Sequence, residues 1–136
     1  MKPRSLIHLV LLIALTGLTV GPAAAQDAWR IGTILPITGP QAKNGIKNFD
    51  GIKIATDMIN DAGGVLGKKI VLVSADASEP QAAASEANRL ITNEKITAII
   101  GTQSSSLSMA ATVVAEQNKV FYIENEGVSG QITGRG

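Results

Sequence analysis

Hydrophobic and polar positions switch between two spacings along residues 29–123 of the chain. Short apolar runs rich in β-branched residues predict strands at residues 29–35, 70–74, 96–100 and 120–123. Between the strands, apolar residues recur every three or four positions, which predicts helices at residues 45–62, 78–92 and 107–117. Strands that alternate with helices pair in parallel through right-handed crossovers. The pattern therefore predicts an α/β fold with a doubly wound parallel sheet.

Local signals refine several of these elements. Gly63 and Gly64 follow the first predicted helix, and glycine accepts the left-handed conformation that closes a helix. The 70–74 strand is β-branched and nearly uncharged, so we expect it to be buried on both faces of the sheet. Ser78 precedes Pro80, which predicts Ser78 as the cap of the second helix.

The first 25 residues have the three parts of a secretory signal. Lys2 and Arg4 form a positive head, residues 6–20 are apolar, and residues 23–25 are alanines suited to cleavage. A membrane anchor is the alternative, but the apolar run is shorter than the roughly 20 residues that a spanning helix needs. We expect a signal peptide at residues 1–25, cleavage after Ala25 and a periplasmic mature protein.

Composition excludes several classes of function. Without the signal segment the chain is nearly neutral and has no basic cluster, which argues against a nucleic-acid partner. The sequence has no cysteine, and its one histidine, His8, lies in the segment that we expect to be removed. We therefore expect no metal site, no cofactor and no common acid–base or nucleophilic mechanism.

Four predicted loops share one edge of the sheet, and ligands of open parallel sheets bind beyond the carboxyl ends of the strands. These loops are residues 36–45, 76–80, 101–106 and 124–130. The 101–106 loop is the most informative, because its hydroxyls and backbone donors precede a helix and favour binding of an anion. The alternative is that Ser104 or Ser105 only caps this helix.

Other chemical interpretations have less support. Neither Gly39 nor Gly101 begins a glycine-rich phosphate-binding motif. The serines have no histidine partner and no G-x-S-x-G element, which argues against an exported enzyme with a flavodoxin-like sheet. Asp76 and Glu79 lie close together at the same edge, and we interpret them as a solvated loop with a helix cap.

Four segments match one family in order and spacing: IGTILPITGPQAKNG, MINDAGGVLGKKIVLVSAD, EPQAAASEANRLI and ITAIIGTQSSSLSMAA, at residues 31–45, 58–76, 79–91 and 96–111. Together they resemble the type I periplasmic binding proteins of branched-chain and hydrophobic amino acid importers. The resemblance implies a protein of two lobes that closes on a small-molecule ligand and then docks on an inner-membrane ABC permease. Residues 26–136 correspond to the N-terminal part of the first, flavodoxin-like lobe, so we expect a truncated chain that binds poorly alone.

The resemblance also implies a carboxylate site. In the family, the serine after the third strand binds the ligand carboxylate through its hydroxyl and backbone N–H, and Ser105 is the matching residue. Ser104 and Ser106 are its neighbours. An aromatic side chain in the first loop of the family often packs on the ligand, and here the matching residue is Asn44.

The loop after the fourth strand supplies the family's contacts to the α-ammonium group of the ligand. The matching residues are Glu126, Gly127 and Val128. Members that bind branched-chain amino acids usually have a threonine hydroxyl where this chain has Val128, so one ammonium contact is missing. Glu124 or Glu126 could replace it as the ammonium partner.

The hypothesis that follows is a periplasmic substrate-binding component of an ABC transporter. It captures branched-chain or other hydrophobic amino acids, or related small carboxylates or amides. The alternative is an extracytoplasmic ligand-sensing domain of the same fold that feeds a receptor. Neither hypothesis includes bond-making chemistry.

Overall fold

The computed structural model describes residues 28–134 of the 136-residue chain. The expected signal peptide and its cleavage site after Ala25 lie outside these residues. All the predicted strands and helices are present, and the short helix α5 is an additional element. In chain order the elements are β1 (Trp29–Leu35), α2 (Ala42–Asp61), β2 (Ile70–Asp76), α3 (Pro80–Thr92), β3 (Ala98–Gly101), α4 (Ser105–Gln117), β4 (Phe121–Ile123) and α5 (Gly130–Thr133).

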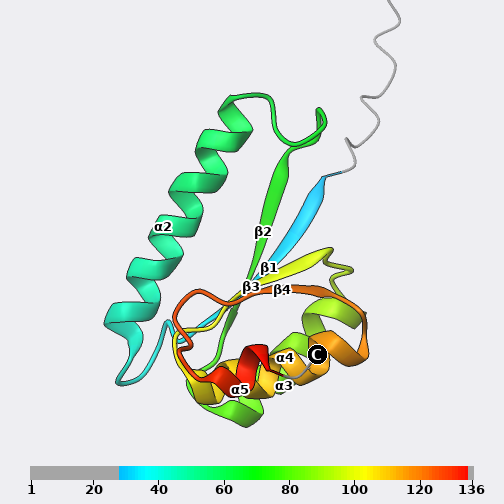
Figure 1. The fold of residues 1–136 in the computed structure, drawn as a ribbon. Coiled ribbons are helices and arrows are strands. Elements are labelled where there is room, and N and C mark those ends of the chain that lie inside the picture. Colours follow the sequence, from blue (N-terminus) through cyan, green and yellow to red (C-terminus); the bar gives the residue numbers. More distant parts are fainter. Residues whose placement is uncertain (1–27, 135–136) are drawn as a thin grey trace, which may run out of the picture.

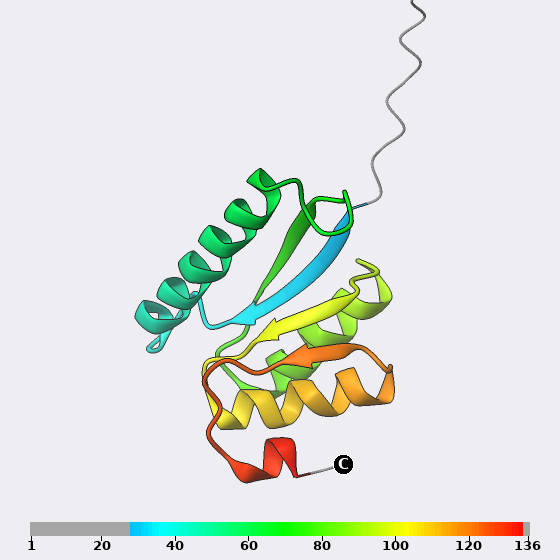
Figure 2. The same cartoon turned by 45° about the horizontal axis from the view of Figure 1, so that its top comes forward.

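The four strands form one parallel sheet in the order β2-β1-β3-β4 (Figure 1). Thr33 in the central strand β1 pairs with Ser74 of β2 on one side and with Ile100 of β3 on the other. The chain moves from β1 to β2 and then back past β1 to β3, so its crossovers lie on both faces. Helix α2 covers one face, and α3 and α4 cover the other (Figure 2). The predicted doubly wound parallel sheet is confirmed.

The main core lies between the sheet and helices α3 and α4. Ile34 of β1 and Ile99 of β3 are fully buried there with Leu90 of α3 and Leu107 of α4. Burying one such side chain stabilises the fold by about 1.5–3 kcal/mol. Small residues let the helices approach the strands, among them Ala83, Ala87, Ala111 and Ala115. This packing fixes α4, whose first turn lies at the carboxyl edge of the sheet.

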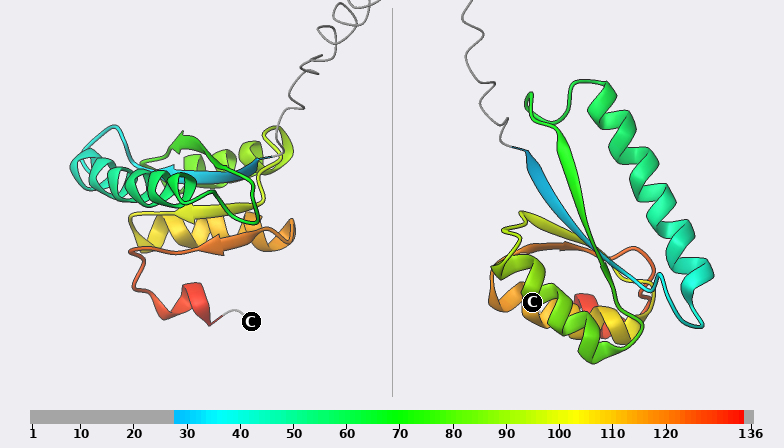
Figure 3. Two further views of the ribbon diagram at one scale, coloured as in Figure 1. Left: turned by 90° about the horizontal axis from the view of Figure 1, so that it is seen from above. Right: turned by 180° about the vertical axis from the view of Figure 1, so that it is seen from behind.

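Helix α2 packs more loosely on the opposite face. A gap of about 210 Å³ separates it from the sheet, between Ile52 and Ile59 of the helix and Ile31 and Leu72 of the strands. On the same face, Phe121 of β4 is 68% exposed. Seen from above, the strands follow one another from β2 to β4, and α5 lies beyond β4 (Figure 3).

Strand β2 does not have the environment that its sequence predicts. It was expected to be buried on both faces, but it lies at an edge of the sheet and Val71 is 41% exposed. The reason is the topology: the chain returns across β1 to form β3, so β1 is the only strand that pairs with β2 among the described residues. The prediction of full burial is therefore wrong.

The connection from α2 to β2 follows the sequence signals closely. Gly63 and Gly64 have φ values of 106° and 81°, which confirms the predicted helix end. The side chain of Asn60 donates to the carbonyl of Ile70 over 2.8 Å and accepts the Ile70 N–H over 2.7 Å. It thereby takes the place of a neighbouring strand and joins the end of α2 to the start of β2.

The three long helices all begin at positions other than those predicted, and α4 begins at Ser105 rather than at residue 107. Helix α2 begins at Ala42 rather than at residue 45, so Asn44 lies in its first turn and not in a loop. Helix α3 has Glu79 as its N-cap residue, in extended conformation, and no side chain caps it. Ser78 lies one residue before that position, so the prediction of Ser78 as the cap is wrong.

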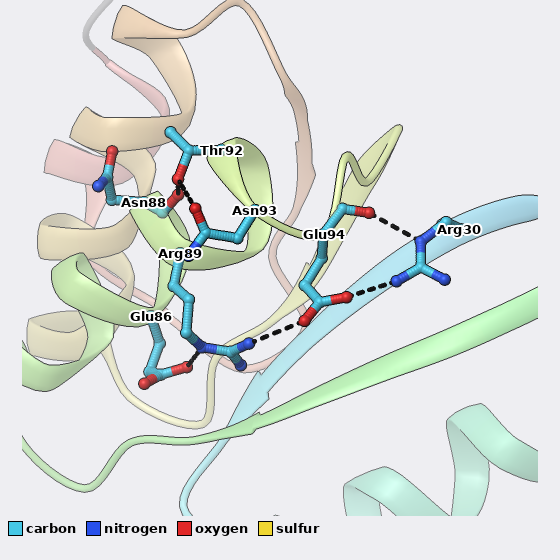
Figure 4. Close-up of polar contacts among 7 residues, drawn as sticks. All are labelled: Arg30, Glu86, Asn88, Arg89, Thr92, Asn93 and Glu94. Carbon is cyan, nitrogen blue, oxygen red and sulfur yellow. Dashed lines mark hydrogen bonds and ion pairs between the residues drawn. The ribbon is translucent and has the colours of Figure 1, made fainter.

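An ion-pair network lies at the other end of the sheet, where β1 begins and α3 ends (Figure 4). The carboxylate of Glu94 contacts Arg30 over 2.5 Å and Arg89 over 3.3 Å. Arg89 also contacts Glu86 over 2.7 Å, and Arg30 donates to the Glu94 carbonyl over 2.7 Å. These contacts join the end of α3 to the first strand.

Candidate functional site

The 101–106 loop leads from β3 into α4 at the carboxyl edge of the sheet. Ser104 has an extended backbone, with φ −142° and ψ 153°, and is the N-cap residue of α4. The alternative that Ser104 caps this helix is confirmed for its position, but its side chain makes no capping hydrogen bond. The N–H groups of Ser105, Ser106 and Leu107 have no acceptor among the described residues. They can donate to an anion at the positive end of the helix.

Two buried hydroxyl groups, of Thr102 and Ser108, lie on the inner side of the start of α4. Thr102 and Ser108 are fully buried, and their oxygens are 2.7 Å apart. Each also lies within hydrogen-bonding distance of the Ser104 carbonyl, at 3.1 Å and 2.9 Å respectively. The Ser104 carbonyl is therefore held from inside the protein. On the outer side, the hydroxyl oxygens of Ser104 and Ser106 are 3.3 Å apart.

Ser105 connects this helix end to the loop after β4. Its Oγ accepts the backbone N–H of Val128 over 3.1 Å and that of Ser129 over 3.2 Å. A serine hydroxyl has two acceptor lone pairs and one proton to donate. Because the loop uses both lone pairs of Oγ, the Ser105 hydroxyl can make only one more hydrogen bond, in which it donates its proton. The hydroxyl is therefore set to donate to an acceptor such as a carboxylate oxygen.

The loop after β4 is held by a carboxylate of its own. Glu124 Oε1 accepts the N–H of Glu126 over 2.9 Å and that of Gly127 over 2.5 Å. A Cβ at Gly127 would lie 2.9 Å from Glu124 Cδ and 2.7 Å from Ile132 Cδ1, so a side chain there would have to displace the Glu124 carboxylate and the tip of Ile132. Glu124 thus shapes the loop through Oε1, while its other oxygen, Oε2, is buried and has no hydrogen-bond partner among the described residues.

A second carboxylate holds the loop after β1 in the same way. Asp76 Oδ1, at the end of β2, accepts the N–H groups of Ile37 and Thr38 over 2.9 and 3.3 Å. Its Oδ2 accepts the Thr38 hydroxyl over 2.5 Å. The Thr38 hydroxyl, together with these two N–H groups, lowers the pKa of Asp76 from its ordinary value, although partial burial acts against them. The interpretation of Asp76 as part of a merely solvated loop is wrong.

The structure brings some of the predicted site residues together and leaves others apart. Ser105 and Val128 are in contact, and the side chain of Val128 is 93% exposed beside the helix end. Asn44 is exposed in the first turn of α2 and has no hydrogen bond to that cluster among the described residues. Glu126 and Gly127 belong to the loop that Glu124 holds. Their roles toward a ligand stay predictions.

The sequence reasoning missed the two carboxylates that hold the loops. The available signal was an acid at or directly after the end of a strand, seen in Asp76 and Glu124. Such an acid is close to the first N–H groups of loops at the same edge, which have no partners in the sheet. The pattern alone does not say which loop the carboxylate will contact.

Glu124 also lines a cavity that lies beside this edge cluster. This cavity of about 470 Å³ between α4, β4 and α5 is lined by Thr112, Tyr122 and Glu124, and burial raises the pKa of Tyr122. Within residues 28–134, no three potential metal ligands gather in one place. No helix in this part combines the length and hydrophobicity needed to cross a bilayer.

A family model, curated proteins and solved structures all match this chain to periplasmic solute-binding proteins. Residues 28–135 match the model of a family described as periplasmic binding protein. A similar curated protein is a Leu/Ile/Val-binding protein homolog of Brucella suis biovar 1 (strain 1330), 41% identical over 129 residues. The match covers 95% of this chain and 32% of that protein. The chain thus spans about a third of the length of this relative.

Two solved structures share the fold. One is the branched-chain amino acid transporter substrate-binding protein of Streptococcus pneumoniae in complex with isoleucine. Its TM-score is 0.77 and its sequence is 32% identical, and the match covers 79% of this chain and 31% of that one. The other is a solute-binding protein of an ABC transporter from Rhodopseudomonas palustris in complex with 3,4-dihydroxybenzoic acid. Its TM-score is 0.72, with 34% identity over 80% of this chain and 30% of that one.

Proposed function

The chain belongs to the periplasmic binding protein family, and from this premise we propose that its Ser105 edge is one wall of a ligand site serving an ABC transporter. The family has a solute-binding fold and is not an enzyme family, and membership implies a periplasmic location. The proposed ligands are branched-chain or other hydrophobic amino acids, or related small carboxylates or amides. The proposed partner is an inner-membrane ABC permease, reached after a signal peptide is cleaved behind Ala25.

The observation that carries this proposal is the arrangement of donors at the start of α4. The Ser105 hydroxyl has its lone pairs occupied by Val128 and Ser129, and the first-turn N–H groups of α4 have no acceptor among the described residues. All of these groups can donate to one carboxylate. Isoleucine and 3,4-dihydroxybenzoic acid, the ligands in the two similar structures, both contain a carboxylate. This shared group supports the assignment of the site.

The binding experiment uses the complete gene product after removal of residues 1–25. A thermal-shift screen of amino acids, amides and small carboxylates identifies ligands, since a ligand at 100 times its Kd adds about 2.7 kcal/mol to stability. Calorimetry then compares Ser105→Ala with Ser78→Ala, a control at an exposed serine of the same edge. We expect Ser105→Ala to weaken binding at least about tenfold, because a hydrogen bond to a charged group is worth roughly 1.5–3 kcal/mol. Equal affinities of the two variants for every ligand contradict the proposal.

A further inference from the structure

The peptide group between Ser104 and Ser105 carries one of the donors of the proposed carboxylate site, the Ser105 N–H. This peptide group is trans and planar, so its N–H and its C=O point in opposite directions. Whatever fixes the Ser104 carbonyl therefore also fixes the direction of the Ser105 N–H. Because this N–H has no acceptor among the described residues, the hydrogen bonds that hold the peptide group are those of its carbonyl.

Three groups that can donate surround the Ser104 carbonyl. The Ser108 N–H donates to it over 3.0 Å, as expected in the first turn of a helix. The hydroxyl oxygens of Thr102 and Ser108 lie 3.1 Å and 2.9 Å from the same carbonyl oxygen, and 2.7 Å from each other. Each hydroxyl has one proton to donate, so each side chain holds the carbonyl either directly or through the other.

The two hydroxyls come from different elements. Ser108 lies in α4, and a serine that binds the carbonyl four residues earlier is a common arrangement within helices. Thr102 lies outside the helix, in the loop directly after β3, and its contact reaches forward over two residues. Thr102 therefore ties the N-cap residue Ser104 to the end of a sheet strand. A contact within α4 alone would not fix the helix end relative to the sheet.

Both side chains are fully buried, which separates their role from that of Ser105. A buried hydroxyl favours the fold only where it is hydrogen-bonded, and an apolar side chain would avoid that requirement. Because neither hydroxyl is exposed to a ligand, an effect on ligand binding has to act through the group that both of them hold. That group is the peptide between Ser104 and Ser105.

We propose that Thr102 and Ser108 are positioning residues of the ligand site, which hold the Ser104 carbonyl so that the Ser105 N–H points at the ligand carboxylate. The inference rests on the proposed function, because it takes the start of α4 as the carboxylate site. It makes the affinity for a carboxylate depend on two hydroxyls that the ligand does not contact.

The test measures, by calorimetry on the complete gene product, the affinity for isoleucine and for 3,4-dihydroxybenzoate. Thr102→Val removes one hydroxyl and keeps the shape of the side chain, and Ser108→Ala removes the other. We expect each variant to weaken binding about threefold to tenfold, the range that one hydrogen bond supplies. Thr102→Ser retains the hydroxyl, and we expect its affinity to stay within about twofold of the wild type.

Thr112→Val is the matched control. It is the same substitution in the same helix, at a threonine whose hydroxyl donates to the Ser108 carbonyl over 2.7 Å, one turn beyond the helix start. We expect it to change the affinity by less than about twofold. A loss that Thr112→Val or Thr102→Ser shares in full overturns the inference, because a general loosening of α4 would then explain it.

The remaining outcomes separate the inference from the proposed function. Unchanged affinities in Thr102→Val and Ser108→Ala overturn the inference, and if Ser105→Ala still weakens binding, the proposed function stands. If Thr102→Val does not fold, Ser108→Ala decides between the same two results. If the wild type binds neither probe nor any other carboxylate of the screen, the proposed function fails and the inference fails with it.

Discussion

Val128 donates its backbone N–H to the hydroxyl oxygen of Ser105 over 3.1 Å, although 23 positions separate the two residues in the sequence. The contact joins the loops that follow β3 and β4, which are adjacent strands of the sheet. It organises the helix end before a ligand binds. A binding site that is already ordered loses less conformational freedom when its ligand arrives.

Ser105→Ala is expected to loosen the loop after β4 as well as to weaken ligand binding. Removal of one hydroxyl leaves the N–H groups of Val128 and Ser129 without their acceptor. A hydrogen bond contributes about 0.5–1.5 kcal/mol, so these two amides should exchange with solvent about threefold to tenfold faster in the ligand-free protein. Hydrogen exchange measured by NMR checks this. Unchanged rates at both amides would show that the contact does not hold the loop.

Glu124→Ala and Glu124→Gln distinguish two roles of this side chain. If Glu124 shapes the loop through its Oε1, glutamine retains an acceptor and alanine does not. We expect Glu124→Ala to weaken ligand binding about tenfold and Glu124→Gln to weaken it less than about threefold. Calorimetry with the best ligand of the screen measures both. An equal, large loss in the two variants indicates that the negative charge itself is needed, as an ammonium partner requires.

Asp76→Asn is expected to lower stability at neutral pH but not in acid. The pKa of Asp76 is lowered in the folded state, so its contribution is present above the ordinary value of 3.8 and is lost as the pH falls through the lowered value. The partly exposed carboxylate should contribute up to about 1 kcal/mol at pH 7. Urea unfolding of the wild type and the variant from pH 7 down to pH 2 measures this difference. A difference that stays constant over the range would contradict the assignment to the Asp76 charge.

Leu66→Asn is expected to stabilise the protein. Leu66 and Gly67 are the central residues of the turn between Val65 and Lys68, with φ values of 52° and 77°. A turn with positive φ at both central positions favours Asn-Gly, whereas leucine is strained there. Leu66 is 88% exposed, so its replacement loses little packing. We expect a gain of about 1 kcal/mol in urea unfolding. Leu66→Ala is the control, because alanine keeps the backbone penalty, and an equal gain in that variant would rule out the strain explanation.

Glu94→Gln is expected to weaken the ion-pair network at the start of β1. Glu94 contacts two arginines whose side chains are about 40% exposed, so the expected loss is only about 0.5–1 kcal/mol at low salt. The loss should shrink in 1 M salt, where charges are screened over about 3 Å. Asp57→Asn removes the more exposed Lys53–Asp57 pair and should change stability less. A loss that is independent of salt would point to packing rather than charge.

The sequence predicts the local elements well because their signals are local. Gly63 and Gly64 end α2 through their own backbone conformations, and the hydrophobic spacing identifies each strand and long helix. The position of β2 at the sheet edge was not predictable from residues 70–74, because an apolar strand has the same sequence whether one or two neighbours pair with it. Strand order is decided by the path of the whole chain.

In the candidate site, too, local features can be predicted from the sequence, whereas contacts between distant segments cannot. The hydroxyls of residues 104–106, followed by a helix, predict an anion site from the sequence, and the structure places the first turn of α4 there. The engagement of Ser105 Oγ by Val128 and the inward use of Glu124 depend on the side-by-side placement of β3 and β4. No spacing within the chain encodes those contacts. The sequence suggested Glu124 as an ammonium partner. Its contacts with the N–H groups of Glu126 and Gly127 are seen only in the folded loop.

The most direct measurement is a crystal structure of the complete gene product with the tightest ligand from the screen. We expect a ligand carboxylate oxygen within about 2.5–3.0 Å of Ser105 Oγ, and a second contact to a first-turn N–H of α4. The Val128 and Ser129 N–H groups should still donate to Ser105. A ligand whose carboxylate lies elsewhere, with the start of α4 facing only water, would contradict the central claim.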